Sequence, residues 1–162
     1  MKLHFLRHTT AVDIAVSDAA RELTRIGQEE ARVAGAGLAA LGAMPALILA
    51  SPLLRAQQTA AIAARALNFS GAVATLDELS NDFATADLLR TLKPHRAAAE
   101  ILLVGHMPSL AGHVAALVGT ESDEDFAFGK GSVACVELTE LRLGTGQLRW
   151  RMRLAQLREL AR

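Results

Sequence analysis

The sequence has little of what many sites are built from: it contains one cysteine, Cys135, one tryptophan and no tyrosine. A single cysteine excludes an internal disulfide and a cysteine-rich zinc site. Its apolar surroundings, SVACVEL, predict a buried and unreactive thiol. The 17 basic residues equal the 17 acidic ones, so no net charge draws the chain toward nucleic acid or anionic lipid.

Long apolar runs are also missing: no stretch approaches the roughly 20 apolar residues of a membrane span. The first residues show no secretion signal, with its charged start, apolar core and cleavage site. We therefore expect a cytoplasmic protein with no nucleic-acid partner and no membrane partner. No coiled-coil pattern is present, and a monomer is the default expectation.

The 162 residues suit one domain, 1–162, with a hydrophobic core of its own. Apolar or β-branched runs predict six strands, and the first four alternate with helical patterns. This order predicts an α/β fold, a three-layer α/β/α sandwich with a largely parallel central sheet. The last two strands predict a C-terminal antiparallel hairpin. The predicted strands are residues 3–6, 46–50, 72–76, 101–104, 132–138 and 147–152.

Three helices are predicted between the strands. The longest, in LTRIGQEEARVAGAGLAALG, has Thr24 as its expected N-cap and residues 42–45 as its stop. The second lies in SPLLRAQQTAAIAARAL. The third lies in GHMPSLAGHVAALVG, where Pro108 suits the first helical turn.

Polar clusters follow three of the predicted strands, at the point where each strand ends. They are Arg7-His8, the segment SPLLR that ends at Arg55, and Gly105-His106. In a parallel sheet these ends share one edge, where α/β proteins place their ligand sites. Arginines and nearby helix N-termini favour phosphate or carboxylate. Because the set has no carboxylate pair and no thiol, it suits phosphoryl transfer to a histidine.

These clusters resemble the signatures of a known family. LRHTTA, SPLLRAQQT and VGHMP are similar to the RHG, SP..RA.QT and GH.P motifs of the histidine phosphatase (phosphoglycerate mutase-like) superfamily, in the same order and at similar separations. The stretch SDAARELTRIG resembles the SD..R.LT..G motif of its SixA-type phosphohistidine phosphatase branch. The resemblance covers nearly the whole chain.

The resemblance implies a role for each matching residue. His8 would be the nucleophile that becomes a transient phosphohistidine. Arg7 and Arg55 would bind the phosphoryl oxygens, and His106 would donate a hydrogen bond to the same group. Arg21 would complete the substrate pocket. The resemblance implies no cofactor and no metal.

Two positions and one missing insertion shape the substrate prediction. Thr9 stands where the family usually has glycine, so it either donates a hydroxyl hydrogen bond to the substrate or crowds the pocket. Glu78 lies near the segment in which ester-cleaving relatives carry a general acid. The short connection between the second helix and residue 100 leaves no room for a cap domain. An open site predicts a phosphorylated protein as partner, for example a histidine-containing phosphotransfer domain.

Alternatives remain open at this point. The chain can be a small-molecule phosphate-ester phosphatase of the same superfamily, or a non-catalytic module that binds a phosphoprotein because Thr9 has damaged turnover. His4, His8, His106 and His113 can also be imagined as metal ligands, although arginines would repel a cation. For His113 we expect a capping or surface role.

Overall fold

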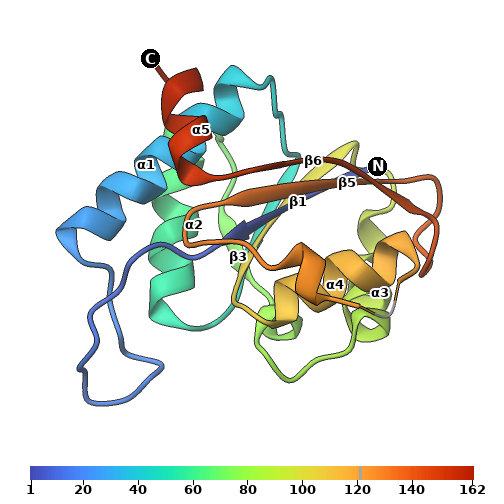
Figure 1. Ribbon diagram of the computed structural model, residues 1–162, viewed down its shortest axis with the longest axis horizontal. Coiled ribbons are helices and arrows are strands. Elements are labelled where there is room, and N and C mark those ends of the chain that lie inside the picture. Colours follow the sequence, from blue (N-terminus) through green and yellow to red (C-terminus); the bar gives the residue numbers. More distant parts are fainter. Residues whose placement is uncertain (121) are drawn as a thin grey trace.

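The computed structural model describes residues 1–120 and 122–162, which form one six-stranded sheet with helices on both sides (Figure 1). The strand order is β3-β2-β4-β1-β5-β6. The strands are β1 Lys2–Arg7, β2 Leu47–Ala50, β3 Val73–Thr75, β4 Glu100–Gly105, β5 Val133–Leu138 and β6 Gly146–Met152. The α-helices are α1 Arg25–Ala40, α2 Leu54–Ala66, α3 Thr85–Leu92, α4 Ser109–Val118 and α5 Leu154–Leu160, and the short 3₁₀ helices are η1 Asp77–Leu79, η2 Lys93–His95 and η3 Glu124–Phe126.

The pairing confirms the predicted sheet. Strands β3, β2, β4 and β1 are parallel to one another. Strand β5 is antiparallel to β1, and β5 and β6 form the antiparallel C-terminal pair. In the register of β1 with β4, Arg7 lies opposite Gly105. The last residues of these two strands therefore arrive side by side at one edge of the sheet.

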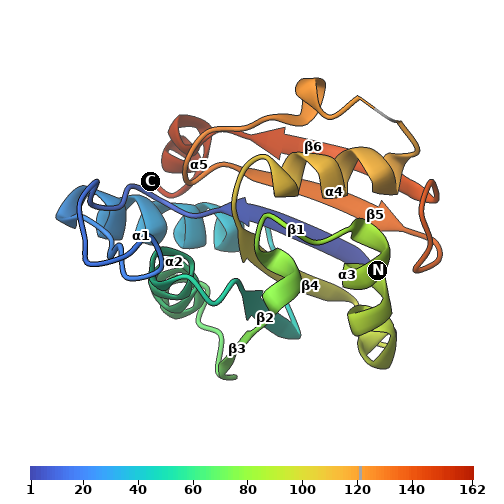
Figure 2. The same cartoon turned by 90° about the horizontal axis from the view of Figure 1, so that it is seen from below.

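The sheet is covered on both faces, as the three-layer prediction requires. Along β1, Phe5 packs in a cluster with Leu88 of α3 and Val114 of α4. Leu6 points to the other face, where it packs with α1, α2 and Leu157 of α5. This alternation follows from the period of two residues in a strand. Figures 1 and 2 show α1, α2 and α5 grouped on one side and α3 and α4 on the other.

Helix α1 begins where the sequence predicts. The Thr24 hydroxyl accepts a hydrogen bond from the Gly27 backbone N–H at 3.0 Å, which satisfies a free donor of the first turn. A Cβ on Gly27 would lie 1.9 Å from the Thr10 carbonyl oxygen, so only glycine allows this close approach. The start of α1 is therefore packed directly against the loop that follows β1.

Some elements differ from the sequence prediction. The C-terminal helix α5 is not among the predicted helices, although it supplies the buried Leu157 to the core. Helix α4 begins at Ser109, so Pro108 is its N-cap and not a residue of its first turn. Between α2 and β4 the chain forms only β3, η1, α3 and η2, and no cap domain is inserted. Within the described residues, no helix combines the length and apolarity needed to cross a membrane.

Candidate active site

The residues that follow three parallel strands meet at one edge of the sheet. The His8 N–H after β1 donates to the Gly105 carbonyl oxygen at 3.0 Å, and the Ser51 N–H after β2 donates to the Val104 carbonyl oxygen at 3.0 Å. These bonds extend the sheet by one residue. The imidazole rings of His8 and His106 consequently lie with centroids 5.0 Å apart.

The side chain of His8 is held in one orientation by its own loop. Its Nδ1 lies 2.8 Å from the Thr9 carbonyl oxygen, and the ring is 8% exposed. A carbonyl oxygen only accepts, so Nδ1 carries the hydrogen and Nε2 of the neutral ring keeps its lone pair. This tautomer is the one that a nucleophile at Nε2 requires.

Burial keeps both site histidines neutral. The pKa of His8 is lowered to about 4, mainly by burial and further by the charges of Arg55 and Arg7. The pKa of His106 is lowered to about 3, again mainly by burial, with additional effects from His8 and Arg55. The positive charge of the exposed Lys130 also lowers the pKa of His8, which makes Lys130 a charged neighbour that the sequence analysis did not identify.

We expect the rings of His8 and His106 to remain neutral down to a pH of about 5, whereas a histidine in an unfolded chain titrates near 6.5. As the pH falls from about 6.5 toward 4, the histidines of the unfolded state bind protons, whereas His8 and His106 of the folded state stay neutral. The free energy of unfolding therefore decreases. Nitrogen-15 NMR of the histidine rings measures the first effect, and urea unfolding at several pH values measures the second. Titration of His8 near pH 6.5 in the folded protein would contradict this account of the site.

The two ring nitrogens of His106 differ in their hydrogen bonding. Its Nε2 lies 2.8 Å from the Ser51 hydroxyl oxygen, while its Nδ1 is buried and has no partner. When the Ser51 hydroxyl donates to Nε2, the hydrogen of the neutral ring is on Nδ1 and is free for a bound anion. Ser51 is thus a hydrogen-bond partner of His106, a contact that the sequence analysis did not assign to the SPLLR motif.

Arg7 and Arg55 are anchored at one end of the guanidinium and unpaired at the Nε–H. Arg7 donates from Nη1 to the Phe128 carbonyl oxygen at 2.9 Å, and Arg55 donates from Nη1 and Nη2 to Asp18. Among the described residues, the buried side-chain nitrogens without a partner are Arg7 Nε, Arg55 Nε, His106 Nδ1 and His4 Nδ1. Unpaired buried donors are costly, and three of these four lie in the motif set. This pattern is that of an anion site.

Thr9 follows His8 but points into the fold. Its fully buried hydroxyl donates to the Gly27 carbonyl oxygen at 2.8 Å and lies 3.2 Å from the Thr59 hydroxyl. Among the described non-glycine residues only Asn68 has a positive φ, so Thr9 does not occupy a conformation reserved for glycine. Thr9 therefore packs the loop onto α1 and α2, and its hydroxyl is already engaged away from any substrate.

In this structure the side chains of Arg21 and Glu78 are both hydrogen-bonded to other groups of the chain. Arg21 donates from Nε to the Val12 carbonyl oxygen at 2.7 Å and from Nη1 to the Asp18 carboxylate at 3.1 Å. The Glu78 carboxylate accepts the hydroxyl hydrogen of Thr91 in α3. Both side chains thus have hydrogen-bond partners within the chain, and a direct contact of either with substrate stays a prediction.

His4, His113 and Cys135 are buried in the fold. His4 lies 3.0 Å from the Glu100 carboxylate. His113 is buried, contrary to the expected capping or surface role, because its ring packs between the hydroxyls of Thr85 and Ser109. Burial raises the pKa of the Cys135 thiol to about 11. In residues 1–120 and 122–162, no group of three or more His, Cys, Asp or Glu side chains is arranged to hold a metal ion.

An anion pocket with a neutral, oriented histidine at the carboxyl edge of the sheet is what a phosphate-transferring site requires. The chain belongs to the histidine phosphatase superfamily (branch 1), whose family model matches residues 3–87. Membership of this superfamily and the similarity to SixA described below support a phosphatase activity.

The resemblance to the SixA-type branch is confirmed. Phosphohistidine phosphatase SixA of Escherichia coli (strain K12) is 29% identical over 94% of this chain and 93% of its own. A solved structure of the protein histidine phosphatase SixA complexed with tungstate superimposes with a TM-score of 0.88, at 29% identity, over 97% of this chain and 99% of that one.

Two further proteins are similar to this chain in sequence or in fold. An uncharacterized protein of Picosynechococcus sp. is 37% identical over 68% of both chains. A structure of an alpha-ribazole-5'-P phosphatase from Escherichia coli matches with a TM-score of 0.76 at 20% identity, covering 92% of this chain and 95% of that one, and shows the shared fold.

Proposed function

We propose that this phosphatase removes the phosphoryl group from a phosphorylated histidine on another protein, through a covalent phosphohistidine on His8. The observation that carries the proposal is the oriented His8 ring, whose Nε2 keeps its lone pair, together with the buried, unpaired N–H donors of Arg7, Arg55 and His106. The SixA similarity supports the choice of phosphohistidine as substrate.

The site residues suit a two-step reaction. In the first step, Nε2 of His8 attacks phosphorus, the P–N bond to the substrate histidine breaks, and the leaving imidazole takes a proton. The free N–H groups of Arg7 and Arg55 bind the phosphoryl oxygens and stabilise the charge that spreads over them. The His106 Nδ1–H donates to the same group. In the second step, water attacks the phosphorus, the bond to His8 breaks, and inorganic phosphate leaves.

The position of Glu78 favours a phosphohistidine over an ester. A general acid contributes about 10² to 10⁴-fold when the leaving group is poor, and an alkoxide leaves far less readily than an imidazole. The Glu78 carboxylate is bonded to the Thr91 hydroxyl, so in this structure it is not directed at a leaving group. A site without a poised acid suits the nitrogen leaving group.

The surroundings of the site favour a protein substrate. No cap domain is inserted, and the loop of residues 12–20 beside the site exposes two apolar side chains, Ile14 at 91% and Val16 at 98%. Asp18 of the same loop bonds to Arg55, which fixes the loop at the pocket. Exposed apolar side chains at a catalytic mouth suit contact with the surface of another protein. A histidine-containing phosphotransfer domain is the partner class we propose.

The two alternatives differ in what supports them. A phosphate-ester phosphatase would use the same pocket, and it is distinguished by substrate preference alone. The non-catalytic module rested on Thr9 disturbing the pocket. Because the Thr9 hydroxyl bonds to the Gly27 carbonyl oxygen, the structure gives no support to that premise.

The proposal is tested by comparing kcat/KM on a phosphohistidyl phosphotransfer domain with kcat/KM on small phosphate esters. We expect the phosphoprotein to be preferred by about 10²-fold or more, since remote contacts supply binding energy that a small ester lacks. The double variant Ile14→Ser, Val16→Ser should lose about 10-fold on the phosphoprotein and stay unchanged on the small substrate.

The matched control is Met44→Ser. Met44 is 81% exposed and lies between α1 and β2, at the edge of the sheet opposite the site. It should leave both activities unchanged. Equal losses on both substrates in the double variant would contradict protein docking at this loop, and a preference for small esters would contradict the proposed substrate.

A further inference from the structure

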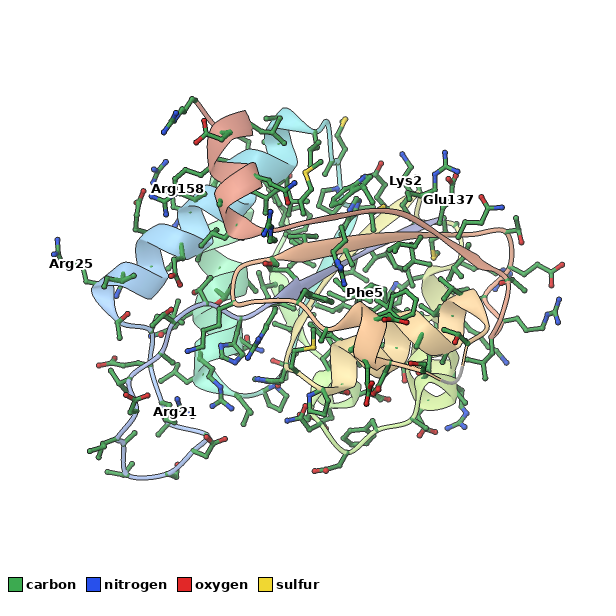
Figure 3. All side chains as sticks on the ribbon, in the orientation of Figure 1. Lys2, Phe5, Arg21, Arg25, Glu137 and Arg158 are labelled. Atoms are coloured by element: carbon green, nitrogen blue, oxygen red, sulfur yellow. The ribbon has the colours of Figure 1, made fainter. Side chains whose placement is uncertain are left out.

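Asp18 holds two arginines of the site region at once. Arg55 donates from Nη1 to the Asp18 backbone carbonyl oxygen at 2.8 Å and from Nη2 to its carboxylate at 3.0 Å. Arg21 donates to the other carboxylate oxygen at 3.1 Å. Figure 3 shows Arg21 on the projecting loop between β1 and α1 that also carries Asp18. This loop is therefore connected to the phosphate pocket through one acidic residue.

The contacts with Asp18 leave some N–H donors of the Arg55 guanidinium, here called its fork, without a partner. A guanidinium has five N–H donors in a fixed plane, and Asp18 takes two of them. The Arg55 Nε–H is among the remaining donors and is buried with no partner. Since the plane is rigid, fixing the two Nη atoms also fixes the direction of Nε–H.

Arg7 shows the same arrangement with a different anchor. Its Nη1 donates to the Phe128 carbonyl oxygen, and its Nε–H is buried and unpaired. A neutral carbonyl anchors Arg7, whereas Arg55 is anchored by a carboxylate. The Arg55 side chain is 8% exposed and the Asp18 side chain is 63% exposed. A buried arginine is therefore held by a carboxylate at the surface.

We propose that Asp18 is the positioning residue of Arg55, and that Arg21 acts through Asp18 and not by contact with substrate. The proposal rests on the phosphatase function proposed above, because it assigns Arg55 to the phosphoryl group. Arg21 holds one carboxylate oxygen of Asp18, and the other oxygen holds Arg55. The role that the family motif suggested for Arg21 as a substrate ligand is thereby replaced by an indirect one.

The charge of Asp18 gives this role a distinctive kinetic signature. A carboxylate next to Arg55 repels a phosphate dianion and weakens its binding. The same carboxylate keeps the Arg55 fork aligned for the transition state. Removing the charge should therefore strengthen binding of phosphate and slow the reaction, a combination that loss of general stability does not produce.

The test is Asp18→Asn, with Asp13→Asn as the matched control. Asp13 lies in the same loop, is 98% exposed and contacts Arg21 at 3.9 Å. For Asp18→Asn we expect a Kd for inorganic phosphate about 3-fold lower and a kcat about 10-fold lower. Asp13→Asn should change neither quantity by more than about 2-fold. Phosphate binding is measured by calorimetry. The kcat is measured with a phosphorylated compound that the wild-type protein hydrolyses.

A double-mutant cycle tests the indirect role of Arg21. Arg21→Gln should lower kcat in the wild-type background by about 3-fold and have no effect in the Asp18→Asn background. Additive losses would overturn the relay through Asp18. A kcat for Asp18→Asn equal to wild type, or weaker phosphate binding together with a lower melting temperature, would overturn the positioning role.

Failure of the proposed function is a separate result. If the phosphoprotein is not a substrate, the phosphate Kd and the kcat on another phosphorylated compound still report on Asp18. The positioning role is then judged on those two measurements alone.

Discussion

Replacement of His8 by asparagine should abolish turnover while leaving the protein folded. The asparagine amide can keep the hydrogen bond that His8 Nδ1 makes to the Thr9 carbonyl oxygen, but it has no atom at the position of Nε2. Because Nε2 is the proposed nucleophile, kcat should fall by at least about 10⁴-fold. Steady-state kinetics measure the loss, and circular dichroism checks the fold.

The control for this variant is His95→Asn. His95 is exposed at the end of η2, outside the site, and its replacement should leave kcat unchanged. Phosphate should still bind to the His8→Asn variant, since the N–H donors of Arg7, Arg55 and His106 remain. Turnover by a folded His8→Asn variant within about 10-fold of wild type would rule out nucleophilic catalysis by His8.

The second large effect is expected for Arg7→Lys. Arg7 donates from Nη1 to the Phe128 carbonyl oxygen while its Nε–H stays unpaired. A lysine keeps the charge, but its single ammonium cannot hold the carbonyl and present a second fixed donor to the phosphoryl group. The loss of one preorganised donor to developing charge costs about 10² to 10³-fold in kcat.

Arg25→Lys is the matched substitution away from the site. Arg25 is the exposed first residue of α1 and lies outside the set of site residues, so its change should be neutral. If Arg7→Lys also retained full kcat, the charge of Arg7 and not its geometry would be the property that matters. That result would contradict the fork-based account of the pocket.

The convergence of the site was predictable because it depends on topology. Arg7 ends β1, His8 and His106 directly follow β1 and β4, and Arg55 lies in the first turn of α2 after β2. Because the ends of parallel strands meet at one edge of the sheet, these residues come together there. The apolar runs alone predicted these strands. The three-layer fold and the parallel order were confirmed for the same reason.

The directions of side chains in loops were not predictable in this way. Thr9 turns inward because its hydroxyl donates to the Gly27 carbonyl oxygen of α1 and its backbone N–H donates to the Thr59 hydroxyl of α2. Neither partner lies near Thr9 in the sequence. Asp18 acquires its role from Arg55, which is 37 residues away. Such contacts depend on the docking of loops onto helices, which residue patterns along the chain do not specify.

The central claim is tested most directly by a rapid-quench experiment with a phosphotransfer domain labelled on its phosphohistidine. We predict that the label passes from the domain to His8 as an acid-labile phosphohistidine and appears as inorganic phosphate at the rate of turnover. The His8→Asn variant should show neither the labelled intermediate nor the phosphate. A phosphoprotein that keeps its label in the presence of a protein that rapidly hydrolyses small esters would contradict the account.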